Sequence, residues 1–328
     1  MLLGISPIVA IAPMMAYTDR HYRYLMRLLT KKTHLYTEMI HAKALIHGDT
    51  DRLLHFSKEE HPISLQVGGS DPFELSHCVK LAAEYHYDEV NLNVGCPSER
   101  VQSGEFGACL FKKPNLVANV VAAMNKVGSI PVTVKTRIGV DDHDHYQYLK
   151  NFVKTVAAEN CQTFIIHARK AWLKGLNPKQ NREIPPLDYQ TVYQLKQDFP
   201  DLKIIINGGI KTVEEIQHHL KHVDGVMLGR ESYANPFLFS VIDHAIFNSG
   251  TSLEMTRSQI VEDYLLYMMQ EHQNGVSLRL LIKPLLSLFR DQPGARSWRR
   301  FLTENINKDN LEIVNQALKL VKTNIECN

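Results

Sequence analysis

The feature that most constrains the fold is a short apolar segment followed by a helical segment, a unit that occurs eight times before about residue 249. Short apolar runs bounded by turn residues are typical of strands buried in a parallel sheet. We expect these strands at residues 8–12, 34–39, 63–67, 89–94, 132–136, 163–167, 203–207 and 225–228. Eight such strands alternating with helices predict an α/β fold, the (β/α)8 or TIM barrel, which takes roughly 250 residues.

The rest of the chain is predicted to be helical. Capping boxes beginning at Thr256 and Asp309 open two helices there, as Thr18 is expected to cap the first helix of the barrel region. Apolar residues then recur at helical spacing. We therefore expect two domains, a catalytic barrel over residues 1–249 and an all-α domain over residues 250–328.

Composition excludes several classes of protein. The formal charge of +2 gives no global sign of nucleic-acid binding, so any basic surface must be local. The five cysteines form no Cys-x-x-Cys pair, which argues against zinc sites, iron–sulfur clusters and a disulfide framework. No apolar run is long enough to span a bilayer, and the N-terminus lacks the basic start of a signal peptide. We expect a cytoplasmic protein with no membrane association and no obligate protein partner.

The fourth predicted strand ends in a turn that carries a cysteine. Gly95 and Pro97 flank Cys96, and no strand can continue through this sequence. Cys96 therefore lies just past the C-terminal end of a strand, where barrels of this kind carry their chemistry. A free thiol has a pKa of about 8.5, so it can donate a proton as readily as act as a nucleophile. A lone cysteine is also commonly a small core residue. A long loop to Lys113 follows and contains a second candidate, Cys109.

The residues that end or follow the predicted strands should share one face of the barrel. Besides Cys96 they are Pro13, Met14, Met15, Gln66, Asn93, Lys135, His167, Asn207, Gly208, Gly209, Gly229 and Arg230. The groups after strands seven and eight have the placement of a barrel phosphate site. A lysine facing the barrel mouth is costly without an anionic partner. Together they predict bound flavin mononucleotide (FMN), although glycines that simply form turns and a buried, satisfied His167 are the structural alternatives.

One segment has the residue types of a metal site. Residues 141–145 carry five side chains in a row, all Asp or His, that could be metal ligands. They lie before a predicted helix, where acidic residues serve as caps, and they lack ordered ligand spacing. We predict no bound metal.

Two local basic clusters could contact RNA. The first follows the sixth strand and comprises Arg169, Lys170, Lys174, Lys179 and Arg182. The second, in the helical domain, comprises Arg279, Lys283, Arg290, Arg296, Arg299 and Arg300. Trp172 and Trp298 would add stacking surfaces for bases. A solvated charged face explains the same clusters equally well, so the basic residues alone do not decide.

Taken together, the motifs resemble those of the tRNA-dihydrouridine synthases, and within them the A-type. The shared motifs are Ala12-Pro13-Met14, Gln66-Val67-Gly68, Asn91-Leu92-Asn93-Val94-Gly95-Cys96-Pro97, Val134-Lys135-Thr136-Arg137-Ile138-Gly139, His167-Ala168-Arg169, Asn207-Gly208-Gly209-Ile210 and Gly229-Arg230. The A-type marker is the segment from His167 through Trp172 to Asn181-Arg182-Glu183-Ile184-Pro185-Pro186-Leu187. The resemblance covers essentially the whole chain.

The resemblance implies an FMN enzyme that takes hydride from NADPH and reduces uridine in the D-loop of tRNA, at positions 20 and 20a. It implies that Cys96 donates a proton to C5 of the base after hydride from the flavin N5 reaches C6. It also implies tRNA contacts by Asn93, Lys179, Arg182, Arg296 and Arg299. A uracil stacked in folded RNA must swing out to reach a barrel floor.

Two other functions are consistent with parts of the sequence. A flavin reductase acting on a small free pyrimidine or enone would share the barrel but would need no basic helical domain. A non-catalytic RNA-binding protein would need neither the flavin residues nor Cys96.

Overall fold

The computed structural model describes residues 6–247 and 255–326, with backbone alone at Arg100 and at residues 322–326. The chain forms two compact units. The first comprises Met1–Met15 and Thr33–Gly229, and the second comprises Ala16–Lys32 and Arg230–Asn328. The predicted domain boundary falls at residues 248–254, which lie outside the described residues, so the predicted boundary stays a prediction.

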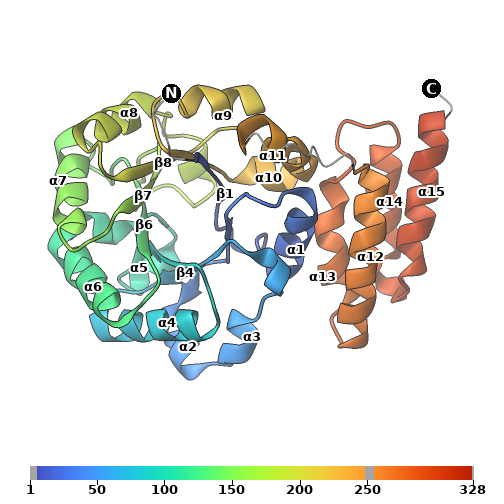
Figure 1. Cartoon of the computed structure of the whole chain (residues 1–328), viewed down its shortest axis with the longest axis horizontal. Helices are drawn as coiled ribbons and strands as arrows, with labels where there is room; N and C mark the ends of the chain where they lie inside the picture. Colours follow the sequence, from blue (N-terminus) through green and yellow to red (C-terminus); the bar gives the residue numbers. More distant parts are fainter. Residues whose placement is uncertain (1–5, 248–254, 327–328) are drawn as a thin grey trace. The chain divides into compact units, whose positions relative to one another are not determined.

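The first unit is a ring of parallel strands, visible in Figure 1. Its strands are β1 (Ile8–Ile11), β2 (Leu35–Tyr36), β4 (Ile63–Gly68), β5 (Glu89–Asn93), β6 (Val132–Arg137), β7 (Thr163–His167), β8 (Lys203–Asn207) and β9 (Gly225–Leu228). Their order is β1-β9-β8-β7-β6-β5-β4-β2. The ring closes where Ala10 pairs with His34, whose N–H donates to the Val9 carbonyl at 2.8 Å. The predicted (β/α)8 barrel is confirmed.

The second strand differs from its prediction. Only Leu35–Tyr36 forms β2, and a separate short strand, β3 (Ile40–His41), pairs with the C-terminal end of β4. Residues 37–39 lie between them without strand geometry. The apolar run therefore predicted the presence of the strand but overestimated its length.

Helices surround this ring (Figure 1). They are α2 (Ala42–His47), α3 (Thr50–Leu54), α4 (Pro72–Glu84), α5 (Glu99–Ser103), α6 (Pro114–Val127), α7 (Tyr146–Ala157), α8 (Tyr189–Asp198) and α9 (Val213–His219), with 3-10 turns η1 (Lys58–Glu60), η2 (Gly107–Lys112) and η3 (Gln180–Arg182). Asp71 caps α4 by accepting the Glu74 N–H at 2.9 Å. Thr212 and Glu215 form the predicted capping box of α9.

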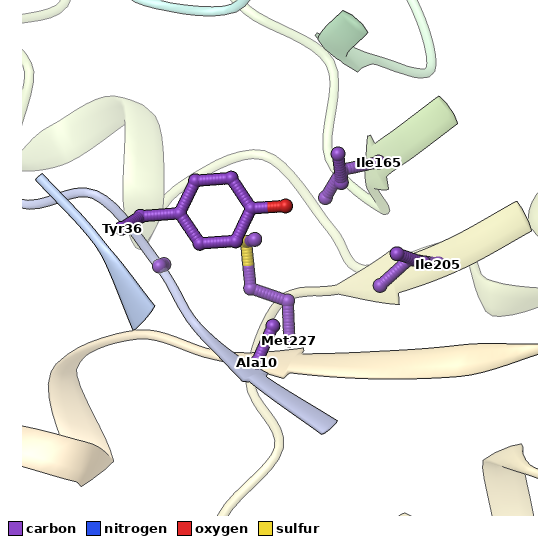
Figure 2. Packing of buried hydrophobic residues seen from close by; sticks show 6 residues of the cluster. Ala10, Tyr36, Ile165, Ile205 and Met227 are labelled. Carbon is purple, nitrogen blue, oxygen red and sulfur yellow. The ribbon is translucent and has the colours of Figure 1, made fainter. Parts of the chain in front are cut away.

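The barrel interior has an apolar side and a polar side. The apolar cluster contains Ala10, Ala12, Tyr36, Ile165, Ile205 and Met227, and Figure 2 shows its side chains meeting from β1, β2, β7, β8 and β9. On β4, β5 and β6, alternate buried positions carry Ser64, Gln66, Asn91, Asn93 and Thr133 instead. Since side chains alternate along a strand, these polar residues share the inward face. The candidate site lies on this polar side, at the C-terminal ends of the strands.

The described residues of the second unit form helices joined by short loops and turns. Its helices are α1 (Arg20–Leu29), α10 (Arg230–Ala234), α11 (Phe239–Phe247), α12 (Arg257–Gln273), α13 (Leu278–Ile282), α14 (Ala295–Asn305) and α15 (Glu312–Glu326), with η4 (Pro236–Leu238), η5 (Lys283–Ser287) and η6 (Ile306–Lys308). Hydrogen bonds tie α1 to the later helices: Tyr22 donates to Ser232 at 3.0 Å, and Thr30 donates to Asp243 at 2.6 Å. No helix of the described residues is long and apolar enough to cross a membrane.

Two predicted helix caps are wrong by one residue. Asp19, not Thr18, caps α1, and its carboxylate accepts the Tyr22 N–H at 2.9 Å. Asp309 has a left-handed backbone (φ +48°) and ends η6. Asn310 accepts the N–H of Glu312 instead, at 2.9 Å. The predicted box at Thr256 is confirmed.

Candidate active site at the barrel mouth

Cys96 lies in a turn that is built by the last residue of β5. The Asn93 side-chain oxygen accepts the N–H groups of Gly95 at 3.1 Å and of Cys96 at 3.0 Å. The thiol is partly exposed and lies 3.6 Å from the Ser98 hydroxyl. The turn is therefore rigid at its backbone while its sulfur stays within reach of a ligand.

The segment after Cys96 is more regular than the predicted loop, because it contains α5 and η2. Its contact with the turn requires a glycine. Gly107 has φ +74°, and a Cβ there would lie 2.6 Å from the Cys96 carbonyl oxygen. The neighbouring Ala108 N–H donates to that same carbonyl at 2.9 Å.

Cys109, the competing thiol, is bonded inside this segment. Its sulfur lies 3.1 Å from the Phe106 carbonyl oxygen, and burial raises the pKa of the Cys109 thiol. A thiol that already donates to a backbone carbonyl is less available to protonate a ligand. The Cys96 thiol also donates, but over a longer distance, 3.6 Å to the Ser98 hydroxyl, so it is the less firmly held of the two thiols.

Gln66 and Asn93 lie side by side at the mouth. Asn93 Nδ2 donates to Gln66 Oε1 at 2.9 Å, and Gln66 Nε2 donates to Asn91 Oδ1 at 2.7 Å. All three amides are buried. Each amide nitrogen carries two hydrogens, so Gln66 and Asn93 each retain one N–H that no acceptor among the described residues uses.

Lys135 supplies a half-buried positive charge next to these amides. It pairs in register with Asn93, and its Nζ donates to Asn207 Oδ1 at 3.1 Å. Burial, reinforced by the nearby Arg137, lowers the pKa of Lys135 from 10.5 to about 7. Within the described residues no carboxylate pairs with this lysine. An anion is therefore the ligand that would stabilise it.

His167 and the Gly208–Gly209 turn pack against each other. These glycines have φ +124° and +75°, and a Cβ at Gly208 would lie 2.9 Å from His167 Cδ2. The turn thus needs glycine twice. Burial, followed by the charges of Arg137 and Lys135, holds the pKa of His167 well below its ordinary value. The imidazole is neutral at pH 7.

The other predicted cofactor residues are placed mainly by the chain. Pro13, Met14 and Met15 follow β1, and the Met15 side chain is exposed. Gly229 follows β9, where an added Cβ would meet only Ala12, at 3.8 Å. Arg230 begins α10 in the helical unit.

Arg137 is a site residue that sequence reasoning quoted within a motif but gave no role. It is only 3% exposed, and its Nε donates to the Gly95 carbonyl at 2.9 Å. Its Nη1 donates to the carbonyls of Lys170 and Asn181, both at 3.1 Å. Burial lowers the pKa of Arg137 to about 10. One guanidinium thus joins the Cys96 turn to the segment after β7.

Lys179 and Arg182 lie on that segment and are exposed, as RNA contacts would need to be. Asn181, which lies between them in the sequence, is buried and fixes the local fold: it accepts the Trp172 N–H at 2.8 Å and donates to the Trp172 carbonyl at 2.9 Å. The Lys170 ammonium lies 4.0 Å from the centre of the Trp172 ring. This part of the first basic cluster is therefore ordered and accessible.

In the helical unit, Arg296 and Arg299 share α14 and are exposed, in accord with the predicted helix. Trp298 does not serve as a stacking surface, which corrects the sequence-based expectation. It is fully buried, and its Nε1 donates to the Leu285 carbonyl at 3.0 Å. Among the described residues, those at positions 141–145 included, no three His, Cys, Asp or Glu side chains are grouped so that they could hold a metal ion.

These side chains fit FMN in three respects. The Gly208–Gly209 turn has backbone conformations that only glycine adopts readily, as a close approach to phosphate requires. Lys135 offers a half-buried cation that lacks a carboxylate partner among the described residues. Gln66 retains one N–H that can meet a ring carbonyl.

Comparison with known proteins gives a consistent result. The family model described as "Dihydrouridine synthase (Dus)" matches residues 10–325. The chain is 54% identical over 321 residues to the tRNA-dihydrouridine(20/20a) synthase of Vibrio vulnificus, covering 97% of this chain and 98% of that protein. It is 55% identical to the proteins of that name from Salmonella typhimurium, over 95% of this chain and 94% of that protein, and from Synechocystis, over 92% and 90%.

Proposed function

Because this chain belongs to the dihydrouridine synthase family, a family of oxidoreductases, we propose that it reduces uridine to 5,6-dihydrouridine in the D-loop of tRNA, at positions 20 and 20a. The single observation that carries the proposal is the grouping of the Cys96 thiol with Asn93 and Lys135 at one end of the barrel. The relatives named for positions 20 and 20a, which match nearly the whole chain, support the choice of substrate.

FMN is the proposed cofactor, with NADPH as the reductant. Gly208 and Gly209, together with Asn207, Gly229 and Arg230, would hold its phosphate end, while Gln66, Lys135 and His167 would meet its ring. Pro13, Met14 and Met15 would cover the ring from β1. Bound FMN would supply the hydride that reaches C6 of the uracil. Lys135, whose burial makes an anionic partner favourable, would stabilise the negative charge of the reduced ring.

Cys96 would complete the reaction by protonating C5 of the base. Its turn is fixed by the two hydrogen bonds to Asn93 and by the contact of its carbonyl with Ala108. A positioned general acid typically contributes a factor of about 10² to 10⁴ in rate. His167 is an unsuitable acid here, because its lowered pKa leaves it neutral at pH 7.

The tRNA would be held by Lys179 and Arg182 on the barrel unit and by Arg296 and Arg299 on α14 of the helical unit. All four side chains are exposed, as contacts with RNA phosphates require. Cations that track the RNA backbone make binding dependent on salt.

The test uses purified protein, an unmodified tRNA transcript and NADPH. We expect noncovalent FMN in the protein, and dihydrouridine at positions 20 and 20a when the product is mapped by mass spectrometry. Free uridine at the same concentration should be a poor substrate. Reduction of free pyrimidines in preference to tRNA would instead support a small-molecule flavin reductase. A colourless protein that binds tRNA without reducing it would support a non-catalytic RNA-binding protein.

A further inference from the structure

The turn after β8 contains one peptide whose orientation its own residues do not fix. Gly208 and Gly209 adopt φ angles of +124° and +75°. A Cβ on either side of a peptide normally restricts how the peptide plane rotates, and both are missing here. The Gly208–Gly209 peptide could therefore turn over at little steric cost. A neighbouring group has to hold it in one orientation.

That neighbour is Tyr189, the first residue of α8. Its hydroxyl donates to the Gly208 carbonyl at 2.8 Å. Among the described residues this is the only hydrogen bond to the peptide, because no second donor meets the carbonyl and no acceptor meets the Gly209 N–H. The orientation of the Gly208–Gly209 peptide thus depends on a single phenol.

The direction of the free N–H follows from the planarity of the peptide. The Gly208–Gly209 peptide is trans, so its carbonyl and its N–H point in opposite directions. The carbonyl is directed at Tyr189, on a helix that lies outside the strand ring (Figure 1). The Gly209 N–H therefore points away from Tyr189. If the peptide turned over, a carbonyl oxygen would replace this donor, and an oxygen repels an anion where an N–H binds it.

Backbone hydrogen bonds set the span that the Tyr189 side chain bridges. The Asp188 N–H donates to the Ala168 carbonyl at 2.9 Å, and the Ala168 N–H donates to the Asn207 carbonyl at 2.8 Å. Tyr189 and Gly208 are the next residues on the two segments that are joined in this way. A phenylalanine at position 189 would fit the same space but could not bond to the carbonyl.

Packing holds the Tyr189 ring in place for this hydrogen bond. The ring meets the His219 ring of α9 edge-on, with centroids 4.5 Å apart. His219 is bonded in turn to the Tyr193 hydroxyl at 2.7 Å. Burial, followed by the charge of Glu215, raises the pKa of Tyr189, so the phenol keeps the hydrogen that it donates.

We propose that Tyr189 is a positioning residue for the cofactor: its hydroxyl holds the Gly208–Gly209 peptide in the orientation in which the Gly209 N–H donates to the phosphate of FMN. This inference rests on the proposed function, because it takes the phosphate to lie at this turn. It gives a role in cofactor binding to a side chain of the helical layer, which acts only through the backbone of the turn.

The experiment compares two flavins that share the ring and differ in the phosphate, FMN and riboflavin. Their dissociation constants are measured by quenching of flavin fluorescence, with the full-length protein freed of flavin. The variants are Tyr189→Phe and, as a matched control, Tyr193→Phe. The control removes a hydroxyl from the same helix, and that hydroxyl bonds to His219 rather than to the turn.

We expect the wild type to bind FMN roughly a hundredfold more tightly than riboflavin, as two hydrogen bonds to a charged group would give. Tyr189→Phe should lower this ratio by roughly three- to tenfold, because a hydrogen bond can bias the peptide by no more than its own net strength. Riboflavin should bind Tyr189→Phe as it binds the wild type. A general loss of stability would weaken both flavins together and leave the ratio unchanged.

A second measurement needs no variant. In wild-type protein labelled with 15N-glycine, the Gly209 amide proton should move downfield when FMN is added but not when riboflavin is added. The same shift with both flavins would overturn the inference.

The inference would also be overturned by an unchanged ratio in Tyr189→Phe, or by an equal fall in Tyr193→Phe, which would show a general loosening of α8. Failure of the wild type to prefer FMN over riboflavin would instead overturn the proposed cofactor site, before any variant is compared.

Discussion

Replacing Lys135 with methionine should stabilise the protein without its cofactor. Burial lowers the lysine pKa from 10.5 to about 7, which corresponds to roughly 5 kcal/mol for holding the charged form in the folded state, at about 1.36 kcal/mol per pKa unit. The substitution also removes the hydrogen bond to Asn207, which contributes about 1 kcal/mol. Lys135→Met should therefore raise the free energy of unfolding of the apoprotein by about 3–4 kcal/mol at pH 6.

This gain should depend on pH in a defined direction. Between pH 7 and pH 10.5 the unfolded chain binds a proton at Lys135 that the folded chain does not, so the unfolding free energy of the wild type rises with pH. The advantage of Lys135→Met is then largest below pH 7 and shrinks by about 1.4 kcal/mol per pH unit above it. Saturating FMN should also narrow the difference, because an anionic ligand that binds the folded state stabilises the wild-type lysine.

The assay is urea denaturation of the apoproteins at half-unit steps from pH 6 to pH 9.5. Lys203→Met, which removes an exposed lysine at the start of β8, is the control for the loss of one positive charge. A difference between wild type and Lys135→Met that stays constant over this range would refute the argument that burial controls this lysine.

Three further outcomes follow from the described contacts. Replacing Arg296 and Arg299 with alanine should weaken tRNA binding and flatten its dependence on salt in filter-binding assays, while NADPH oxidation with oxygen as acceptor stays unchanged. Trp298→Ala should lower the free energy of unfolding by about 3–5 kcal/mol in urea denaturation, since it empties a fully buried site on α14. Arg137→Lys should accelerate proteolysis of the segment after β7, because a lysine cannot span the carbonyls of Gly95 and Asn181 together.

The barrel was predictable because each buried strand is a short apolar run, and the positions of Lys135 and Cys96 followed from where those runs end. The hydrogen bonds among the inward-facing polar side chains of β4, β5 and β6 were not predictable in this way. Those contacts depend on the register between strands, which places Asn91 opposite Thr133 and Gln66 opposite Asn91. Nothing within one strand specifies that register.

Local composition also misled in one place. Trp298 lies between two arginines in sequence, which suggested an RNA-facing surface. On a helix, however, the residue four positions later shares its face, and Leu302 is buried with it. The arginines lie on the exposed face of α14, so helical geometry separates side chains that the sequence places next to one another.

The most direct test of the central claim is the rate at which tRNA oxidises the reduced flavin in Cys96→Ala and in Cys109→Ala. Both variants should hold FMN and accept hydride from NADPH at near wild-type rates, because neither thiol is needed for that half of the reaction. In stopped-flow absorbance, oxidation by tRNA should slow by about 10² to 10⁴ in Cys96→Ala and stay close to the wild-type rate in Cys109→Ala. Oxidation of Cys96→Ala at the wild-type rate would show that Cys96 is not the proton donor.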